Sequence, residues 1–206
     1  PPFGIPSMPS ACLVCEIPLH RVRTDTIDNN ADEDWWWIDA FYMAGPVLAH
    51  VANLENNEAY RTRLGAMFRW MKSTRGLFDP AAGLWYRDAA AKTEISQNGG
   101  KVFWSRGNGW VLAGLVRVLE QLPASHPDHA EYEAMFQTMY AARLPLQGTD
   151  GFWRASLTDP DHFPNPETSG TAFFAHGYGW GIRNGLLNTA DQKPAAPSAP
   201  ERQAWS

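Results

Sequence analysis

Two stretches, FDPAAGLWYRD at residues 78–88 and GTDGFWRASLTDP at residues 148–160, repeat one pattern and decide the fold. Each has a glycine, an apolar residue and a tryptophan in succession, followed closely by an arginine. The two glycines, Gly83 and Gly151, lie 68 residues apart. A pattern that returns at such a distance is typical of a chain built from repeated supersecondary units.

Five helical segments of two alternating kinds surround these loops. The segments near 38–54, 108–121 and 169–187 are apolar or small on nearly every side, which predicts buried inner helices. The segments near 57–73 and 128–147 carry their apolar residues on one face, which predicts outer surface helices. Pro145 is expected to end or kink the second of these. The glycine-rich stretch at 169–187 leaves a strand interpretation open.

An inner helix, an outer helix and a long loop therefore recur about every 65 residues. This alternation predicts an all-α fold of the α/α-toroid type, in which the loops before the inner helices gather at one mouth. A closed toroid of six hairpins needs twelve helices. The five helices predicted here indicate that the toroid is incomplete in this chain, and part of a longer domain is the favoured explanation.

The two ends differ from the middle. Residues 1–31 form an irregular N-terminal segment without a signal-peptide pattern, and residues 189–206 are rich in Pro, Ala and Ser and are predicted to be a flexible tail. Cys12 and Cys15 form a C-x-x-C pair without the second pair that a structural zinc site requires. We interpret them as ordinary thiols.

Composition excludes some classes of function. The formal net charge is −5 and no basic run is present, which argues against nucleic acid as a partner. No stretch is apolar enough to span a bilayer, so no membrane partner is expected. Ten tryptophans among 206 residues provide many flat faces on which sugar rings could stack.

Asp39 is the first candidate for chemistry. It follows Trp35, Trp36 and Trp37 and opens an apolar helix. With Asp34 as the N-cap, Asp39 would lie about one turn inside the helix, on the face of Met43 and Pro46. There it could simply favour the helix dipole. Alternatively, apolar surroundings would raise the pKa of its carboxyl group, as suits a general acid.

The stretch KVFWSRGNGW, residues 101–110, is the second candidate. Arg106 lies between Trp104 and Trp110, and an arginine can bind a carboxylate through two hydrogen bonds while a tryptophan stacks on a sugar ring. The glycines permit a tight turn into the next helix. This composition favours an anionic, ring-shaped ligand, although a structural cation–π pair would give the same pattern.

Two further groups are less specific. In NPETSGTAFF, residues 165–174, Thr168 or Ser169 is expected to cap the next helix. His176 is interpreted as a core histidine. Tyr86, Arg87 and Asp88 form a polar cluster in a mouth loop, where they could contact a ligand or hold the loop together. No nucleophile elbow, phosphate-binding loop, dinucleotide fingerprint or HExxH motif is present.

In their order along the chain, DEDWWWIDAFYMAGP, GLWYRD, KVFWSRGNGW and PETSGTAFF resemble glycoside hydrolase family 105, the unsaturated rhamnogalacturonyl hydrolases, and less closely the related unsaturated glucuronyl hydrolases. The resemblance covers residues 32–188. It implies an (α/α)6 barrel and an enzyme that removes a 4,5-unsaturated uronyl residue from lyase-generated oligosaccharides. In such enzymes an acid protonates C4 of the double bond, water adds at C5, and the hemiketal opens. Neither a metal nor an organic cofactor is implied.

The resemblance also implies residue roles. Asp39 matches the proton donor, and Trp104, Arg106 and Trp110 match the substrate-contact motif. The remaining residues expected to contact the substrate are Trp36, Met43, Arg87 and Asn108. Asp25, Asp28 and Asp32 do not match a second active-site carboxylate.

The expected partner is an unsaturated uronyl oligosaccharide of pectic or glucuronate-containing origin, handled in the cytoplasm. Two alternatives remain open: a carbohydrate-binding remnant without turnover, and another α/α-barrel sugar enzyme such as an epimerase or an ordinary glycosidase. The sequence does not indicate an oligomeric state.

Overall fold

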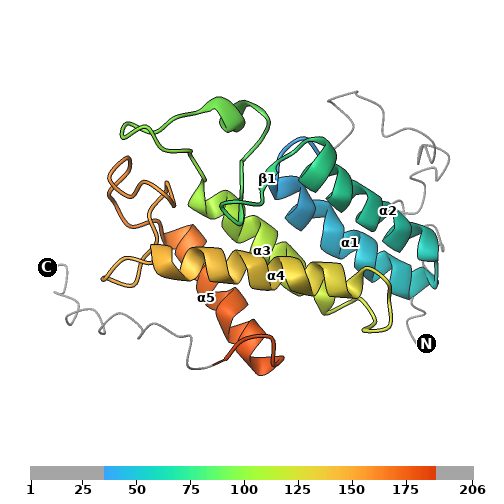
Figure 1. Ribbon diagram of the computed structural model, residues 1–206. Coiled ribbons are helices and arrows are strands. Elements are labelled where there is room, and N and C mark those ends of the chain that lie inside the picture. The colour runs from blue at the N-terminus through green and yellow to red at the C-terminus, as the bar shows by residue number, and fades with distance from the viewer. Residues whose placement is uncertain (1–34, 189–206) are drawn as a thin grey trace, which may run out of the picture. The chain divides into compact units, whose positions relative to one another are not determined.

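Helices that alternate in direction make up most of the structure, a computed structural model that describes residues 35–188 (Figure 1). The predictions for residues 1–31 and 189–206, for Asp34 and for the two cysteines lie outside the described residues. The elements are α1 (Asp39–Glu55), α2 (Glu58–Arg69), the π-helical turn η2 (Trp70–Thr74), β1 (Phe78–Asp79), β2 (Leu84–Trp85), the 3-10 turn η3 (Ala90–Thr93), α3 (Ser105–Leu119), α4 (His129–Arg143), the 3-10 turn η4 (Leu144–Leu146) and α5 (Thr168–Arg183).

The helices form two layers. Figure 1 shows α2 and α4 in front of α1, α3 and α5, and α3 packs against α1, α4 and α5. Helices α1 and α2 pack together as one hairpin, and α3 and α4 as the next. The predicted alternation of inner and outer helices is confirmed, and the segment at 168–183 is a helix rather than a strand.

The inner helices are not equally buried. Nearly every residue of α3 is buried, but α1 exposes Met43, Val47 and Leu54 along one side. The expectation that α1 is covered on all sides is therefore wrong for the described chain. His176 on α5 is exposed, so its interpretation as a core histidine is also wrong.

An aromatic cluster fills the space between the layers. The ring of Phe68 from α2 lies 5.0 Å from Phe41 on α1 and 5.0 Å from Tyr132 on α4. Gly114 on α3 allows this approach, because a Cβ atom there would lie 2.7 Å from the Phe41 ring. Apolar burial of large rings is the main favourable term in such a core.

The helix ends correct two predictions about capping. Helix α1 begins at Asp39, and its N-cap residue Ile38 makes no side-chain cap, so Asp39 is not one turn inside the helix. Helix α5 is capped by Glu167, whose carboxylate accepts a hydrogen bond from the backbone N–H of Gly170. The expected caps, Thr168 and Ser169, lie inside the helix.

The two loops that share the glycine–tryptophan pattern have equivalent local structures. Both glycines have left-handed backbones, with φ of +65° at Gly83 and +81° at Gly151, a region that glycine enters without steric cost. The tryptophans that follow, Trp85 and Trp153, are both buried. In the first loop, β1 and β2 pair antiparallel.

The long loops join at the N-terminal ends of the inner helices. Ile38 N–H donates to the Arg87 carbonyl at 3.0 Å, which ties the start of α1 to the loop after β2. Ser105 N–H donates to the Ala155 carbonyl at 2.8 Å, which ties the start of α3 to the loop before α5. The predicted mouth is therefore present on this side of the two layers (Figure 1). No helix in residues 35–188 is both long and apolar enough to cross a membrane.

Candidate active site

Asp39 lies at the mouth as the first residue of α1. Its side chain is half-buried, and its Oδ1 atom is buried without a hydrogen-bond partner among the described residues. Burial raises the pKa of this carboxyl group above its usual value, while the nearby positive charges of Arg106 and then Arg87 act in the opposite direction. A carboxyl group with this balance holds its proton to higher pH than an exposed aspartate does.

Arg87 reaches the site from the loop after β2. The bridge between Trp37 and Asp88 holds that loop against the residues that precede α1. Arg87 Nε donates to Asp88 at 2.8 Å, and its guanidinium lies 3.6 Å from Glu94. About half of the Arg87 side chain remains exposed, so it can also face a ligand.

Arg106 lies in the first turn of α3. Its guanidinium stacks over Trp104 at 4.3 Å from the ring centroid, and Nη1 lies 3.9 Å from a carboxylate oxygen of Glu167. The side chain of Arg106 is 47% exposed, which leaves donors free to meet an anion. Glu167 is the residue that the sequence interpretation missed as a site component. The PET stretch was quoted, but its carboxylate was considered only as a neighbour of the cap.

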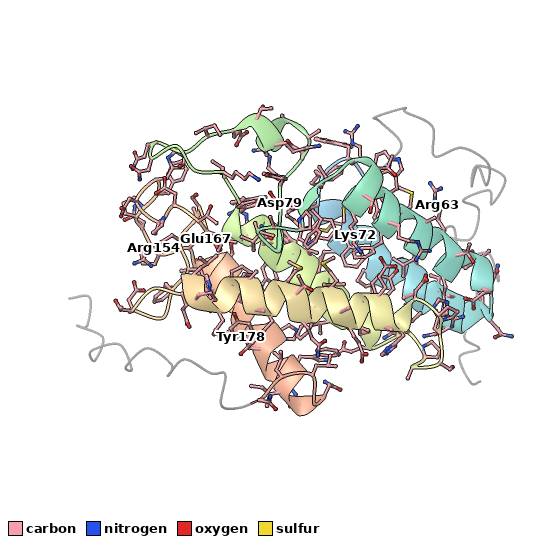
Figure 2. The ribbon with its side chains drawn as sticks, in the orientation of Figure 1. Arg63, Lys72, Asp79, Arg154, Glu167 and Tyr178 are labelled. Carbon is pink, nitrogen blue, oxygen red and sulfur yellow. The ribbon has the colours of Figure 1, made fainter. Side chains whose placement is uncertain are left out.

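Figure 2 shows Glu167 at the start of α5, close to the mouth loops, with Arg154 on the same α4–α5 connection. The two oxygens of Glu167 are engaged: one accepts from the Ser169 hydroxyl at 2.5 Å and the other from Gly170 N–H. The carboxylate thus fixes the beginning of α5 and faces Arg106 at the same time.

Asn108 is placed away from solvent. Its side-chain oxygen accepts from Trp85 N–H at 2.9 Å, and its amide donates to the carbonyls of Trp85 and Trp104, each at 3.0 Å. The residue is fully buried. These contacts tie the loop carrying Arg87 to the first turn of α3, so they give Asn108 a positioning role. Direct contact with substrate, as the sequence suggested, would require these bonds to open.

The other predicted contact residues lie in different environments. Trp36 is 40% exposed and packs against Trp37 at 4.7 Å between ring centroids. Trp110 lies one turn beyond Arg106, between the rings of Tyr42 and Phe173 at 4.6 and 4.4 Å. Met43 is 52% exposed and lines a groove of about 520 Å³ between α1 and α3.

The polar cluster of the first mouth loop acts mainly as a staple. The hydroxyl of Tyr86 donates to Asp79 at 2.8 Å, and Lys101 Nζ donates to the same carboxylate at 2.6 Å. The Lys101 ammonium, followed by the other donors, lowers the pKa of Asp79 to about 2. Asp88 accepts from Ala91 N–H at 2.9 Å and so closes the η3 turn. Figure 2 shows Asp79 beside this loop.

The site thus combines one half-buried acid with two arginines, tryptophan faces and the N-terminal ends of three inner helices. Helix N-termini and arginines both favour an anion. Asp79, Asp88 and Glu167 are all engaged by donors within the described chain. In residues 35–188, no group of three His, Cys, Asp or Glu residues is arranged to hold a metal ion.

Comparison with known proteins gives consistent matches. The model of Glycosyl Hydrolase Family 88 matches residues 19–201. The chain is 37% identical over 171 residues to the unsaturated 3S-rhamnoglycuronyl hydrolase of Formosa agariphila, an alignment that covers 80% of this chain and 45% of that protein.

Solved structures agree with this. A glycosyl hydrolase family 88 protein from Bacteroides vulgatus has a TM-score of 0.79 at 39% identity, covering 86% of this chain and 49% of that one. A structure described as a polysaccharide lyase has a TM-score of 0.77, also at 39% identity, covering 85% and 49%. The chain spans about half the length of the relatives it matches. Over that half, its helices have the (α/α)6-toroid fold, and the predicted resemblance to unsaturated uronyl hydrolases is confirmed.

Proposed function

The chain belongs to glycosyl hydrolase family 88, and from that membership we propose that its site hydrates the double bond of a 4,5-unsaturated uronyl residue at the end of an oligosaccharide. The observation that carries the proposal is the half-buried carboxyl of Asp39, with one unpartnered oxygen, near the positive charges of Arg106 and Arg87. An acid that retains its proton beside cations suits the protonation of an electron-rich alkene in an anionic sugar.

The reaction proceeds through named atoms. Asp39 gives its proton to C4 of the substrate, and the positive charge that develops at C5 is shared with the ring oxygen. Water adds at C5 and returns a proton to the Asp39 carboxylate. The resulting hemiketal opens, and the sugar attached at C1 is released from the opened chain. One carboxyl group therefore serves as acid and then as base.

Arg106 is proposed to bind the carboxylate of the uronyl residue. Its exposed guanidinium supplies paired donors, and its position in the first turn of α3 adds the favourable field of the helix N-terminus. Trp104 supports the guanidinium from below, while Trp36, Arg87 and Trp110 are proposed to border the ring. Asn108 is proposed to hold these loops in register.

The state of the other carboxylates favours this reaction over ordinary glycoside hydrolysis. Two free carboxyl groups about 5–10 Å apart are needed for direct displacement. In the described chain, Asp79, Asp88 and Glu167 near the mouth are each occupied by hydrogen bonds. An action confined to imported oligosaccharides in the cytoplasm remains a prediction.

The test is the ultraviolet absorbance of an unsaturated uronyl disaccharide mixed with the whole chain, because hydration removes the conjugated double bond. We expect the absorbance to fall, and Asp39→Asn to slow this loss by about 10²–10⁴-fold, since an amide cannot supply the proton. Glu133→Gln, the same carboxyl-to-amide change on the surface of α4, is the control and should leave the rate unchanged.

Binding measured by calorimetry separates the alternatives. Disaccharide that binds the chain without any loss of absorbance would indicate a carbohydrate-binding protein. Action on saturated glycosides would indicate another α/α-barrel sugar enzyme. A rise in absorbance with a longer polysaccharide would indicate β-elimination, and any of these results would overturn the proposal.

A further inference from the structure

A second pocket, of about 230 Å³, lies beside the candidate active site. It is lined by Val102, Trp104, Ala155, Ser156 and Phe163. Trp104 belongs to both sites, because it also carries the stacked guanidinium of Arg106. None of the five lining side chains is charged, in contrast to Asp39 and the two arginines of the active site. The two sites are therefore continuous in space but opposite in character.

The walls of this pocket are fixed by pairing between two mouth loops. Trp104 and Ser156 form an antiparallel bridge. Leu157 N–H donates to the Phe103 carbonyl at 2.9 Å, and the Thr158 hydroxyl donates to the Lys101 carbonyl at 2.7 Å. Because backbone bonds hold both walls, the pocket is formed before any ligand arrives.

Phe163 completes the pocket from the tip of the α4–α5 connection. Its ring is 55% exposed, and it packs beside His162 with 4.3 Å between ring centroids. The tip is anchored across to the other loop, where Gln97 donates to the Asp161 carbonyl at 2.7 Å and Asn98 donates to Asp159 at 2.8 Å. A single exposed aromatic residue is common on protein surfaces. Here it is held in place beside a preformed pocket that adjoins the site.

We propose that this pocket binds the neutral sugar ring that follows the unsaturated uronyl residue in the substrate, with Phe163 as the stacking residue. The inference rests on the proposed function. The uronyl carboxylate belongs at Arg106, and a second charged ring in the uncharged pocket would lose hydration without gaining a partner. The C–H face of a neutral pyranose, by contrast, packs favourably against aromatic rings.

The test compares two ligands by calorimetry, with the whole chain carrying Asp39→Asn so that neither is consumed. One ligand is an unsaturated uronyl residue linked to a neutral hexose, and the other is the methyl glycoside of the same unsaturated uronate, which lacks the second ring. We expect Phe163→Ala to weaken disaccharide binding roughly fivefold to tenfold and to leave the methyl glycoside unchanged. Phe163→Tyr should restore disaccharide binding.

Ile95→Ala is the matched control, because Ile95 is 60% exposed on the neighbouring loop but does not line the pocket. Equal binding of the disaccharide before and after Phe163→Ala would overturn the proposal, as would equal weakening of both ligands. Turnover by the unsubstituted chain decides the proposed function separately. Loss of absorbance together with an inert Phe163 would leave that function intact, whereas Phe163-dependent binding without turnover would retain the pocket alone.

Discussion

At the scale of single residues, Asp39 is set apart by the balance of charge and burial around it. Burial raises the pKa of its carboxyl group, and Arg106 and Arg87 partly oppose that rise. The native state therefore holds the Asp39 proton at pH values where an unfolded chain would release it. The stability that this proton contributes is present below the ordinary aspartate pKa of 3.8 and is lost as the pH rises through the raised value.

A change at Arg87 tests this balance directly. Arg87→Gln removes one positive charge that lowers the pKa of Asp39, so that pKa should rise further. Carbon-13 NMR of the labelled carboxyl group would follow the titration, and the alkaline limb of the rate–pH profile should move to higher pH with it. Arg63→Gln, on the outer helix α2, should move neither. A shift toward lower pH would show that Arg87 does not act on Asp39 through its charge.

At the scale of elements, the glycines of α5 show why a helix can be rich in a residue that weakens helices. Glycine costs an exposed helix interior about 1 kcal/mol relative to alanine. At Gly177, however, a Cβ atom would lie 2.4 Å from Leu112 on α3, and at Gly181 it would lie 2.6 Å from Leu187. These glycines allow α5 to approach its neighbours closely, and α3 and α5 share the most extensive contact in the structure.

Two alanine substitutions in α5 should therefore have opposite effects. Gly177→Ala forces Leu112 from its place and is expected to lower the free energy of unfolding by about 1–3 kcal/mol. Gly179→Ala meets only the flexible end of Arg183, at 3.3 Å, and should raise stability by up to about 1 kcal/mol. Urea unfolding of both variants measures this. Equal effects at the two positions would mean that close packing does not explain the glycines.

At the scale of the whole molecule, the described helices form an arc with an uncovered side. Met43, Val47 and Leu54 recur at helical spacing on α1 and are each more than half exposed. The groove between α1 and α3 lies along the same side. The chain spans about half the length of its relatives, which agrees with the incomplete toroid that the helix count predicts.

Charged substitutions on this side measure how open it is in solution. If Val47 and Leu54 are solvated as in the structure, Val47→Lys with Leu54→Lys should change the free energy of unfolding by no more than about 0.5 kcal/mol. Ala49→Lys, at a buried position of the same helix, should be strongly destabilising. A loss of several kcal/mol in the double variant would contradict the expectation and would show that this side is covered in the protein.

The sequence by itself determined the repeated hairpins, the alternation of inner and outer helices, and the motifs that carry Asp39 and Arg106. These features depend on neighbours within a turn or two, so hydrophobic periodicity and local turn residues are enough to predict them. The helix caps were predicted less well. Glu167 won over Thr168 and Ser169 because its longer side chain folds back to reach Gly170 N–H.

Only the tertiary structure decided which residues meet across the mouth. Arg106 faces Glu167 from 61 positions away, and Asn108 holds Trp85 from 23 positions away. The pocket with Phe163 exists because two loops pair along their backbones. Such contacts depend on how helices pack rather than on any local pattern. The exposure of α1 depends in the same way on which neighbours lie beside it, so a uniformly apolar sequence could not predict it.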